Sequence, residues 1–244
     1  MRIAFDLDGV LADLHTPFVR TALQLFPDLE ASAVDTDASA SASTDGADDD
    51  DIPPVLPGVN LSRRQSDVVW RHLANTENFW ESLSEIEEGA IARLAAVADE
   101  RGWEVLFITS RPKSTGRTVQ RQSQRWLQER GFPMPSVYVV HTSRGRIADA
   151  LAIDVVVDDR ADNCLDIVLE SRAGALLLWR GSMESVPVSA KRLGIAAVPT
   201  VDRVLSALVE AERASDGEGL LDRLRQMFGL KARTTSPLVR RPKA

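Results

Sequence analysis

Several residue types are scarce in this sequence, and each shortage excludes a class of protein. Cys164 is the only cysteine among 244 residues, so neither an intrachain disulfide nor a cysteine-rich zinc site can form. No apolar run approaches the ~18 residues that a membrane-spanning helix needs. The first residues, MRIAFDLDGV, lack a basic stretch followed by a long apolar one, so we expect no signal peptide. We therefore expect a cytoplasmic protein that does not bind a membrane.

Lysine is also rare, and the charge is unevenly spread. The lysines are Lys113, Lys191, Lys231 and Lys243. The formal net charge is −7, yet residues 28–51 hold nine acidic side chains and no basic one, which leaves +2 for the rest. No basic stripe dominates that remainder, so we do not expect a nucleic-acid polymer as a partner. Residues 31–54 are rich in Ala, Ser and Asp and free of aromatics, which predicts a disordered acidic loop.

The remaining composition is that of a globular protein. Hydrophobic residues make up 44% of the chain and charged residues 27%, which excludes collagen, a coiled coil and a wholly disordered chain. Short runs rich in Val, Ile and Leu alternate with helical patterns, as in a parallel sheet that is covered on both faces. The expected strands span residues 2–6, 103–108, 137–140, 153–157 and 175–179. The expected helices span residues 11–25, 62–74, 87–101, 118–130, 147–151, 161–172, 202–213 and 220–230.

We therefore expect an α/β fold, namely a doubly wound, Rossmann-like parallel sheet with a small helical cap inserted after the first strand. Residues 1–10 and 88–215 are assigned to the core and residues 11–87 to the cap. Residues 216–244 are assigned to a C-terminal amphipathic helix and a basic tail. The apolar side of that helix should dock on the body of the protein or on a partner subunit, and the second alternative would make a homo-oligomer.

Acidic side chains stand where two of the predicted strands end. Asp6 and Asp8 are two residues apart in an extended segment, so both can face one ligand. Asp158 and Asp159 end another strand, and ligands of such sheets bind at the carboxyl ends of the strands. Four crowded carboxylates call for a cation, and oxygen ligands beside a phosphate suit Mg²⁺. The alternative, that Asp6 and Asp8 only cap the next helix, explains one acid but not four.

A third strand end offers hydroxyl groups and a cation. Thr109 and Ser110 follow the second predicted strand, and Arg111 stands beside them. Hydroxyls and free backbone N–H groups at the start of a helix can hold an anion, although an ordinary helix cap would look the same. An anion between these donors and a metal ion indicates a phosphoryl group.

These motifs resemble those of the haloacid dehalogenase-like (HAD) phosphohydrolase superfamily. The resemblance rests on DLDGV at Asp6–Val10, ITS ending at Ser110 and VVVDD ending at Asp159, in this order and at these strand ends. A finer resemblance is to the 5′(3′)-deoxyribonucleotidase-type branch. It rests on NFWESL from Asn78, EEGA from Glu87, FITSRP, VVVDDRADNC and LLLWR.

The resemblance implies a role for each residue. Asp6 would attack phosphorus and Asp8 would serve as general acid and base. Mg²⁺ would be held by Asp6, by the main-chain carbonyl of Asp8, and by Asp159 or, as second choice, Asp158. Thr109 would hold a phosphoryl oxygen.

The motif-three lysine of the family is absent here. Arg144 takes its place, with Arg146 nearby and Lys113 as a further alternative. Arg146, Ser110 and Arg111 are expected to bind the substrate.

In this superfamily a cap at this position selects the substrate. Phe79 and Trp80 are expected to line the pocket, where their rings could stack on a nucleobase. We therefore expect a Mg²⁺-dependent phosphomonoesterase acting on a small phosphorylated metabolite, with nucleoside 5′-monophosphates as the leading class. The alternatives are a phosphatase for another phosphometabolite and a catalytically weak phosphate-binding protein.

Overall fold

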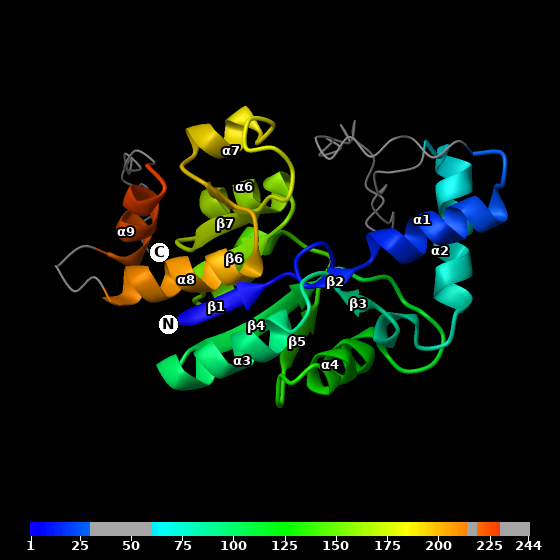
Figure 1. Cartoon of the computed structure of the whole chain (residues 1–244), viewed down its shortest axis with the longest axis horizontal. Coiled ribbons are helices and arrows are strands. Elements are labelled where there is room, and N and C mark those ends of the chain that lie inside the picture. The colour runs from blue at the N-terminus through cyan, green and yellow to red at the C-terminus, as the bar shows by residue number, and fades with distance from the viewer. Residues whose placement is uncertain (30–59, 214–218, 230–244) are drawn as a thin grey trace, which may run out of the picture.

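Six parallel strands form the central sheet of the chain (Figure 1). The computed structural model describes residues 1–29, 60–213 and 219–229. The strands are ordered β5-β4-β1-β6-β7-β8 across the sheet. Their bounds are β1 Arg2–Phe5, β4 Glu104–Thr109, β5 Ser136–Val139, β6 Val155–Asp158, β7 Gly174–Leu178 and β8 Ala196–Val198.

Helices cover both faces of this sheet, which confirms the predicted doubly wound α/β fold. Successive residues of a strand point to opposite faces, so Ile3 and Phe5 join one apolar layer and Ala4 joins the other. The first layer contains α3 Ala90–Arg101, α4 Val119–Glu129, α8 Val201–Arg213 and α9 Leu220–Met227. The second contains α5 Arg144–Ala150, α6 Ala161–Glu170 and α7 Val188–Arg192.

The register of the strands brings their carboxyl ends to one edge. Phe5 lies opposite Phe107 of β4 on one side and Val157 of β6 on the other. The backbone N–H of Asp6 then donates to the carbonyl of Val157 at 2.9 Å, so the chain leaves β1 beside the end of β6. The polar residues that follow these strands are therefore neighbours although they lie far apart in the sequence.

Two helices, α1 (His15–Leu25) and α2 (Arg63–Asn75), lie beside the sheet rather than on it (Figure 1). We call these two helices the cap helices. Ser62 and Gln65 begin α2 with a capping box, in which each side chain bonds the other residue's backbone N–H. The ring centroids of Phe18 on α1 and Trp70 on α2 are 5.1 Å apart, so the two rings pack between the helices.

The chain enters and leaves the cap through a short antiparallel ladder, which we call the neck. It consists of β2 (Ala12–Asp13) and β3 (Ser84–Glu85) and is separate from the six-stranded sheet. The short 3-10 helix η1 (Phe79–Glu81) lies on the way back from α2 to the neck. We call η1 the return segment.

Several short elements differ from the prediction. The first helix begins at His15 rather than at residue 11, because the backbone N–H groups of Leu11 and Ala12 turn back to the carbonyl of Leu7 and lead into the neck. The sequence pattern does not predict β8, α7, η1 or the neck, which span two to five residues each. A period of 2 or 3.6 residues cannot be recognised over so few positions.

No helix in the described ranges is long and apolar enough to cross a membrane. The predicted acidic loop at 31–54 and the basic tail after residue 230 lie outside the described residues.

Candidate functional site

Asp6 lies at the centre of the polar edge of the sheet. Its side chain is 10% exposed, and its Oδ1 accepts a hydrogen bond from Nη2 of Arg144 at 2.9 Å. The Nε atom of Arg144 lies 3.9 Å from Oδ2 of Asp158. The guanidinium therefore stands between two carboxylates from neighbouring strands, where the sequence predicts the cation of this site.

Arg144 reaches this position because α5 packs very close to α6. A Cβ atom on Gly145 would lie 2.3 Å from the carbonyl oxygen of Asp166, so only glycine allows the contact. Within the described part of the chain, the buried Nη1 of Arg144 has no hydrogen-bond partner. An unpaired buried donor is costly, and an anion at this edge would satisfy it.

The two acids that end β6 have different surroundings. Asp158 is fully buried, and its oxygens accept from the side chain of Asn163 at 3.0 Å and from the backbone N–H of Arg160 at 2.9 Å. Asp159 instead lies against Gly9, where an added Cβ would come within 1.9 Å of Asp159 Oδ2. Gly9 also has a φ of +80°, so the sharp turn after Asp8 needs glycine for two reasons.

Burial raises the pKa values of three of these carboxyls, and at Asp6 and Asp159 the neighbouring aspartates raise them further. Burial raises the pKa of Asp6 well above its ordinary value; Arg144 opposes this shift, and the neighbouring aspartates add to it. Burial likewise raises the pKa of Asp158, against the effect of Arg144. The pKa of Asp159 is raised to about 7 by burial and then by the charge of Asp158. Burial thus disfavours the ionised form of all three carboxyls, and Arg144 opposes this at Asp6 and Asp158.

A divalent cation fits this donor set. No group of three or more His, Cys, Asp or Glu side chains forms a ready metal cage among the described residues. Mg²⁺, however, is usually held by one or two carboxylates together with water and substrate phosphate. Asp6 and Asp159 are the carboxylates that would hold it, because both oxygens of Asp158 are already bonded. The main-chain carbonyl of Asp8 stays the predicted third ligand.

The side chain of Asp8 is bound by Arg111. The Nε atom of Arg111 donates to both Asp8 oxygens at 3.1 and 2.8 Å, and Nη2 donates to Oδ1 at 2.7 Å. The hydroxyl of Thr109, at the end of β4, donates to Oδ2 of Asp8 at 3.4 Å. Thr109 is therefore in place beside Asp8, and its contact with a phosphoryl oxygen stays a prediction.

Two expected substrate-binding arginines have other positions. Arg111 has a fully buried side chain that is paired with Asp8, so this arrangement does not present it to a substrate. Arg146 is 78% exposed and pairs with Glu170 at 3.7 Å, away from the aspartates. Residues two apart in a helix point about 200° apart, so Arg144 and Arg146 cannot both face the site. Ser110 is exposed at the end of β4, and its role stays a prediction.

The two aromatic residues of the return segment are also placed differently. Phe79 is 4% exposed and Trp80 is 2% exposed, so neither presents a ring face to a ligand. Their rings pack edge to face at 4.9 Å, and the Trp80 indole N–H donates to the carbonyl of Pro112 at 3.1 Å. This arrangement therefore does not offer either ring for stacking on a nucleobase.

Sequence reasoning assigned no role to Arg180, which holds the loop after β1 in place. Its guanidinium donates to the carbonyl of Gly9 and, at 3.0 Å, to that of Val10. It also pairs with Glu87 at 2.8 Å, and Glu87 accepts the backbone N–H of Val201 at the start of α8. An arginine directly beyond a buried strand, in LLLWR, was the signal that could have found it.

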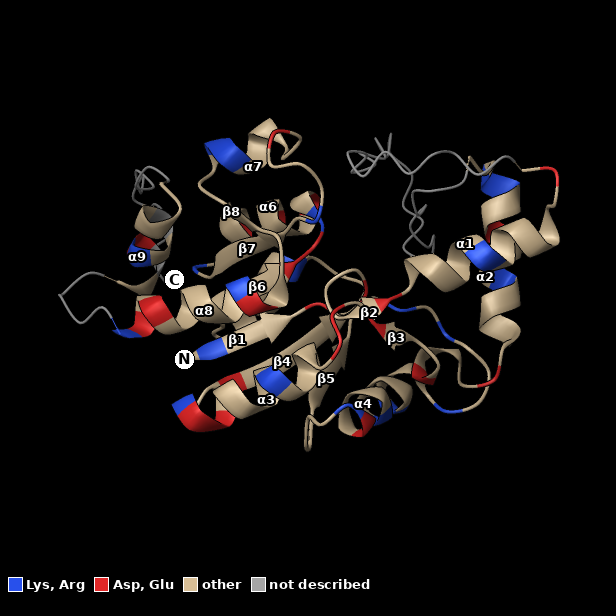
Figure 2. Ribbon diagram, in the orientation of Figure 1, with Lys and Arg blue, Asp and Glu red and all other residues tan. Residues whose placement is uncertain are grey.

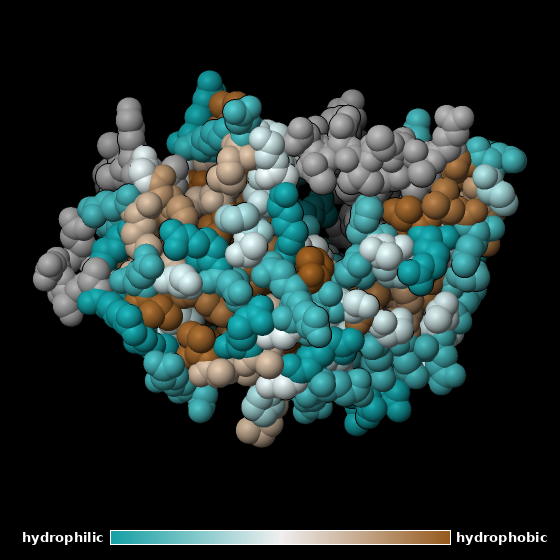
Figure 3. All heavy atoms as spheres, in the orientation of Figure 1, coloured by the Kyte–Doolittle hydropathy of each residue, from teal (hydrophilic) through white to brown (hydrophobic). Residues whose placement is uncertain are grey.

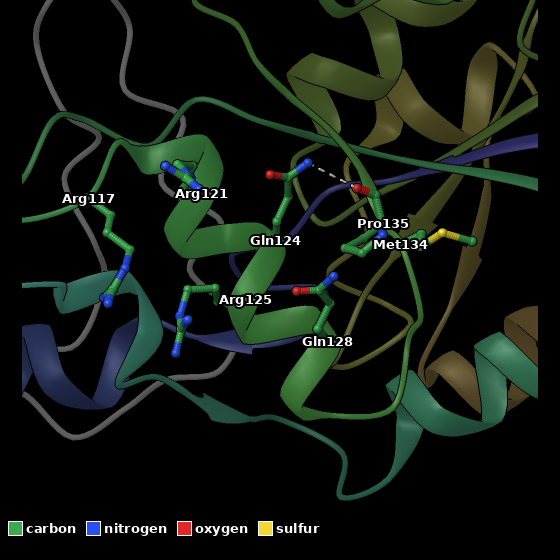
Figure 4. Close-up of a pocket in the computed structure, with 7 residues that line it drawn as sticks. All are labelled: Arg117, Arg121, Gln124, Arg125, Gln128, Met134 and Pro135. Carbon is green, nitrogen blue, oxygen red and sulfur yellow. Dashed lines mark hydrogen bonds between the residues drawn. The ribbon is translucent and has the colours of Figure 1, made fainter.

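The surface supports this edge as the functional one. Acidic residues gather where β1 ends and the neck begins (Figure 2). The face in Figure 3 is hollowed between the body built on the sheet and the cap helices. A separate cavity of about 420 Å³ lies on the outer side of α4 and is lined by Arg117, Arg121 and Arg125 among others (Figure 4). Arg117 and Arg125 there pair with Glu81, and none of the clustered aspartates lines that cavity.

The sheet and its edge define an α/β protein of the Rossmann-like class, and comparison with known proteins gives matches among solved structures. No known protein-family profile matches the sequence, and no curated protein sequence matches it. A hydrolase from Pseudomonas syringae is 12% identical over 86% of this chain and 99% of its own, with a TM-score of 0.47. A HAD family hydrolase from Deinococcus radiodurans R1, solved with bound phosphate and sodium, is 19% identical over 86% of this chain and 96% of its own. Its TM-score of 0.55 shows that the two proteins share a fold.

Proposed function

We propose that this protein is a Mg²⁺-dependent phosphomonoesterase that hydrolyses a small phosphorylated metabolite through Asp6. The observation that carries the proposal is the guanidinium of Arg144, which bonds Asp6, lies beside Asp158 and leaves a buried N–H unpaired. A phosphoryl oxygen is an anion that would accept that N–H. The similar fold of a HAD family hydrolase that binds phosphate supports the same assignment.

The chemistry proceeds in two displacements. A carboxylate oxygen of Asp6 forms a bond to phosphorus, while the bond to the leaving oxygen breaks and its electron pair leaves with that oxygen. Asp8, protonated at the start of this step, gives its proton to the leaving oxygen and becomes the carboxylate. Water then attacks the phosphorus atom of the aspartyl-phosphate, Asp8 takes the proton of that water, and Asp6 is released together with inorganic phosphate.

A cation is needed for the first displacement. Burial keeps the pKa of Asp6 high, which favours a neutral carboxyl that cannot attack. Bound Mg²⁺ would supply positive charge that favours the ionised carboxylate and neutralises the transferring phosphoryl group. Asp6 and Asp159 are the side chains that would hold it.

The substrate is proposed at the level of a small phosphomonoester. The finer expectation of nucleoside 5′-monophosphates rests on the resemblance to the nucleotidase-type motifs, and the burial of Phe79 and Trp80 removes the ring stacking that would have supported it. A panel of nucleoside monophosphates, sugar phosphates and other small phosphoesters tests the class. Turnover of sugar phosphates without turnover of nucleotides would remove the nucleotidase branch.

The central test is the hydrolysis of p-nitrophenyl phosphate with and without Mg²⁺. We expect Asp6→Asn to abolish turnover and Arg144→Ala to abolish most of it, with partial recovery in Arg144→Lys because lysine restores the charge. Arg146→Ala is the matched control on the same helix and should stay within about twofold of wild type, as exposed substitutions away from a site do. Equal rates for wild type and Asp6→Asn would instead indicate a phosphate-binding protein.

A further inference from the structure

Arg111 forms a bidentate ion pair with Asp8. Its side chain is fully buried, whereas the Asp8 side chain is 17% exposed and lies at the polar edge. Two nitrogens of the guanidinium bond both oxygens of the carboxylate. A bidentate pair of this kind fixes the plane and direction of a carboxylate, which a single hydrogen bond does not.

The guanidinium is itself held from three sides. Its remaining Nη1 donates to the hydroxyl of Ser123 on α4 at 2.9 Å. Its central carbon lies 4.8 Å from the ring centre of Trp80 and 5.8 Å from that of Trp126. Cations are attracted to such rings, more strongly when they are shielded from water. Arg111 therefore has little freedom to leave Asp8 for a ligand.

Trp80 connects this arrangement to the cap. It belongs to the return segment, and its backbone N–H donates to the side chain of the buried Gln122 at 3.0 Å. Its indole N–H donates to the carbonyl of Pro112, the residue after Arg111. A shift of the return segment would thus move the ring that covers the guanidinium.

We propose that Arg111 is a positioning residue that orients Asp8, and that Trp80 makes this orientation depend on the seating of the return segment. The inference rests on the proposed function, in which Asp8 must meet the leaving oxygen and then the attacking water. A misplacement of about 1 Å in such a group can cost about 100-fold in rate. Arg111 does not touch the phosphoryl group, so its removal should affect turnover and spare binding.

The test compares Arg111→Met and Arg111→Lys with wild type and with Arg130→Met. Arg130 is a matched control, because it lies 4.5 Å from the same Trp126 ring and none of its hydrogen bonds reaches Asp8. We expect Arg111→Met to lower kcat for p-nitrophenyl phosphate about 100-fold and to change the inhibition constant of inorganic phosphate less than threefold. Arg111→Lys should recover part of kcat, and Arg130→Met should keep kcat within threefold of wild type.

Two further measurements separate positioning from mere support of the fold. In an Asp8→Asn background, Arg111→Met should add no further loss of kcat, because a residue that acts only through Asp8 has nothing left to orient. Trp80→Leu should lower kcat in the same direction, again with the phosphate inhibition constant preserved. Should Arg111→Met fail to fold, Arg111→Lys in the two backgrounds decides the question.

The inference is overturned if Arg111→Met keeps kcat within threefold of wild type, or if its loss multiplies with that of Asp8→Asn. It is also overturned if phosphate inhibition weakens in parallel with kcat. If wild-type protein turns over no phosphoester, the proposed function fails instead. The Asp8–Arg111 pair is then tested by a double-mutant cycle in urea unfolding, where zero coupling would refute the ion pair itself.

Discussion

The raised pKa of Asp159 predicts that the metal-free protein becomes less stable as the pH rises. The ordinary pKa of this carboxyl is 3.8, and burial together with Asp158 raises it to about 7 in the folded state. Between these values the folded protein holds a proton that the unfolded chain has lost, so stability falls with rising pH. A shift of about three units corresponds to about 4 kcal/mol, most of it lost between about pH 4 and pH 7.

The assay is urea unfolding in EDTA, followed by tryptophan fluorescence from pH 5 to pH 8. Asp159→Asn cannot ionise, so the difference in unfolding free energy between variant and wild type should grow with pH in favour of the variant. Asp149→Asn, which changes an exposed carboxyl on α5, should keep the wild-type slope. Added Mg²⁺ should stabilise wild type more at pH 8 than at pH 5, because it binds the ionised carboxylates.

The outcome that refutes this reasoning is a parallel pH dependence for wild type and Asp159→Asn. It would mean that Asp159 ionises at its ordinary pKa, and that neither burial nor the charge of Asp158 raises that pKa. The opposite result would be an increase in wild-type stability from pH 5 to pH 7 that is lost in Asp159→Asn. That result would show that folding lowers the pKa of Asp159 rather than raising it, as pairing with a cation of the protein would do.

Two further predictions concern the packing that supports the site. Gly145→Ala should lower the melting temperature by the equivalent of about 1–3 kcal/mol, because its Cβ would press on α6, and it should lower kcat by displacing Arg144; an unchanged melting temperature would show that α5 can move freely. Ser62→Ala should destabilise the start of α2 by about 1 kcal/mol through loss of the capping box, measured as faster amide exchange there. Equal protection in the variant would mean that contacts with other helices, rather than the cap bond, hold that turn.

The sequence was sufficient for the fold because its strongest pattern is also the one that decides the fold. Buried strands such as Val155–Asp158 alternate with amphipathic helices, a pattern that makes the strands parallel and so places their carboxyl ends at one edge of the sheet. The sequence pattern therefore predicts that Asp6, Asp8 and Asp158 lie close together. Strands as short as Ala196–Val198 have too few residues to show a period, so they escaped prediction.

Side-chain direction was the part that sequence could not supply. Arg111 follows a strand as a phosphate ligand would, and only its tertiary contacts with Asp8, Ser123 and two indoles show that it faces inward. Arg146 is different, because helical geometry alone separates it from Arg144 once α5 is known to begin at residue 144. The predicted helix begins at residue 147, three residues after the observed start of α5, so this geometric separation of the two arginines was not used.

The neck has a consequence for how this molecule could acquire a new specificity. Asp13 and Ser84 sit opposite each other in its two-residue ladder, so a tight turn of the kind that joins hairpin strands would close the chain there. No described residue between them belongs to the six-stranded sheet, so a replacement segment inserted there would leave the hydrogen bonds of that sheet in place. The replacement segment would need an indole in place of Trp80, since otherwise the guanidinium of Arg111 would lose a ring that now covers it. Replacement segments can therefore be screened first for an aromatic residue at the position of Trp80.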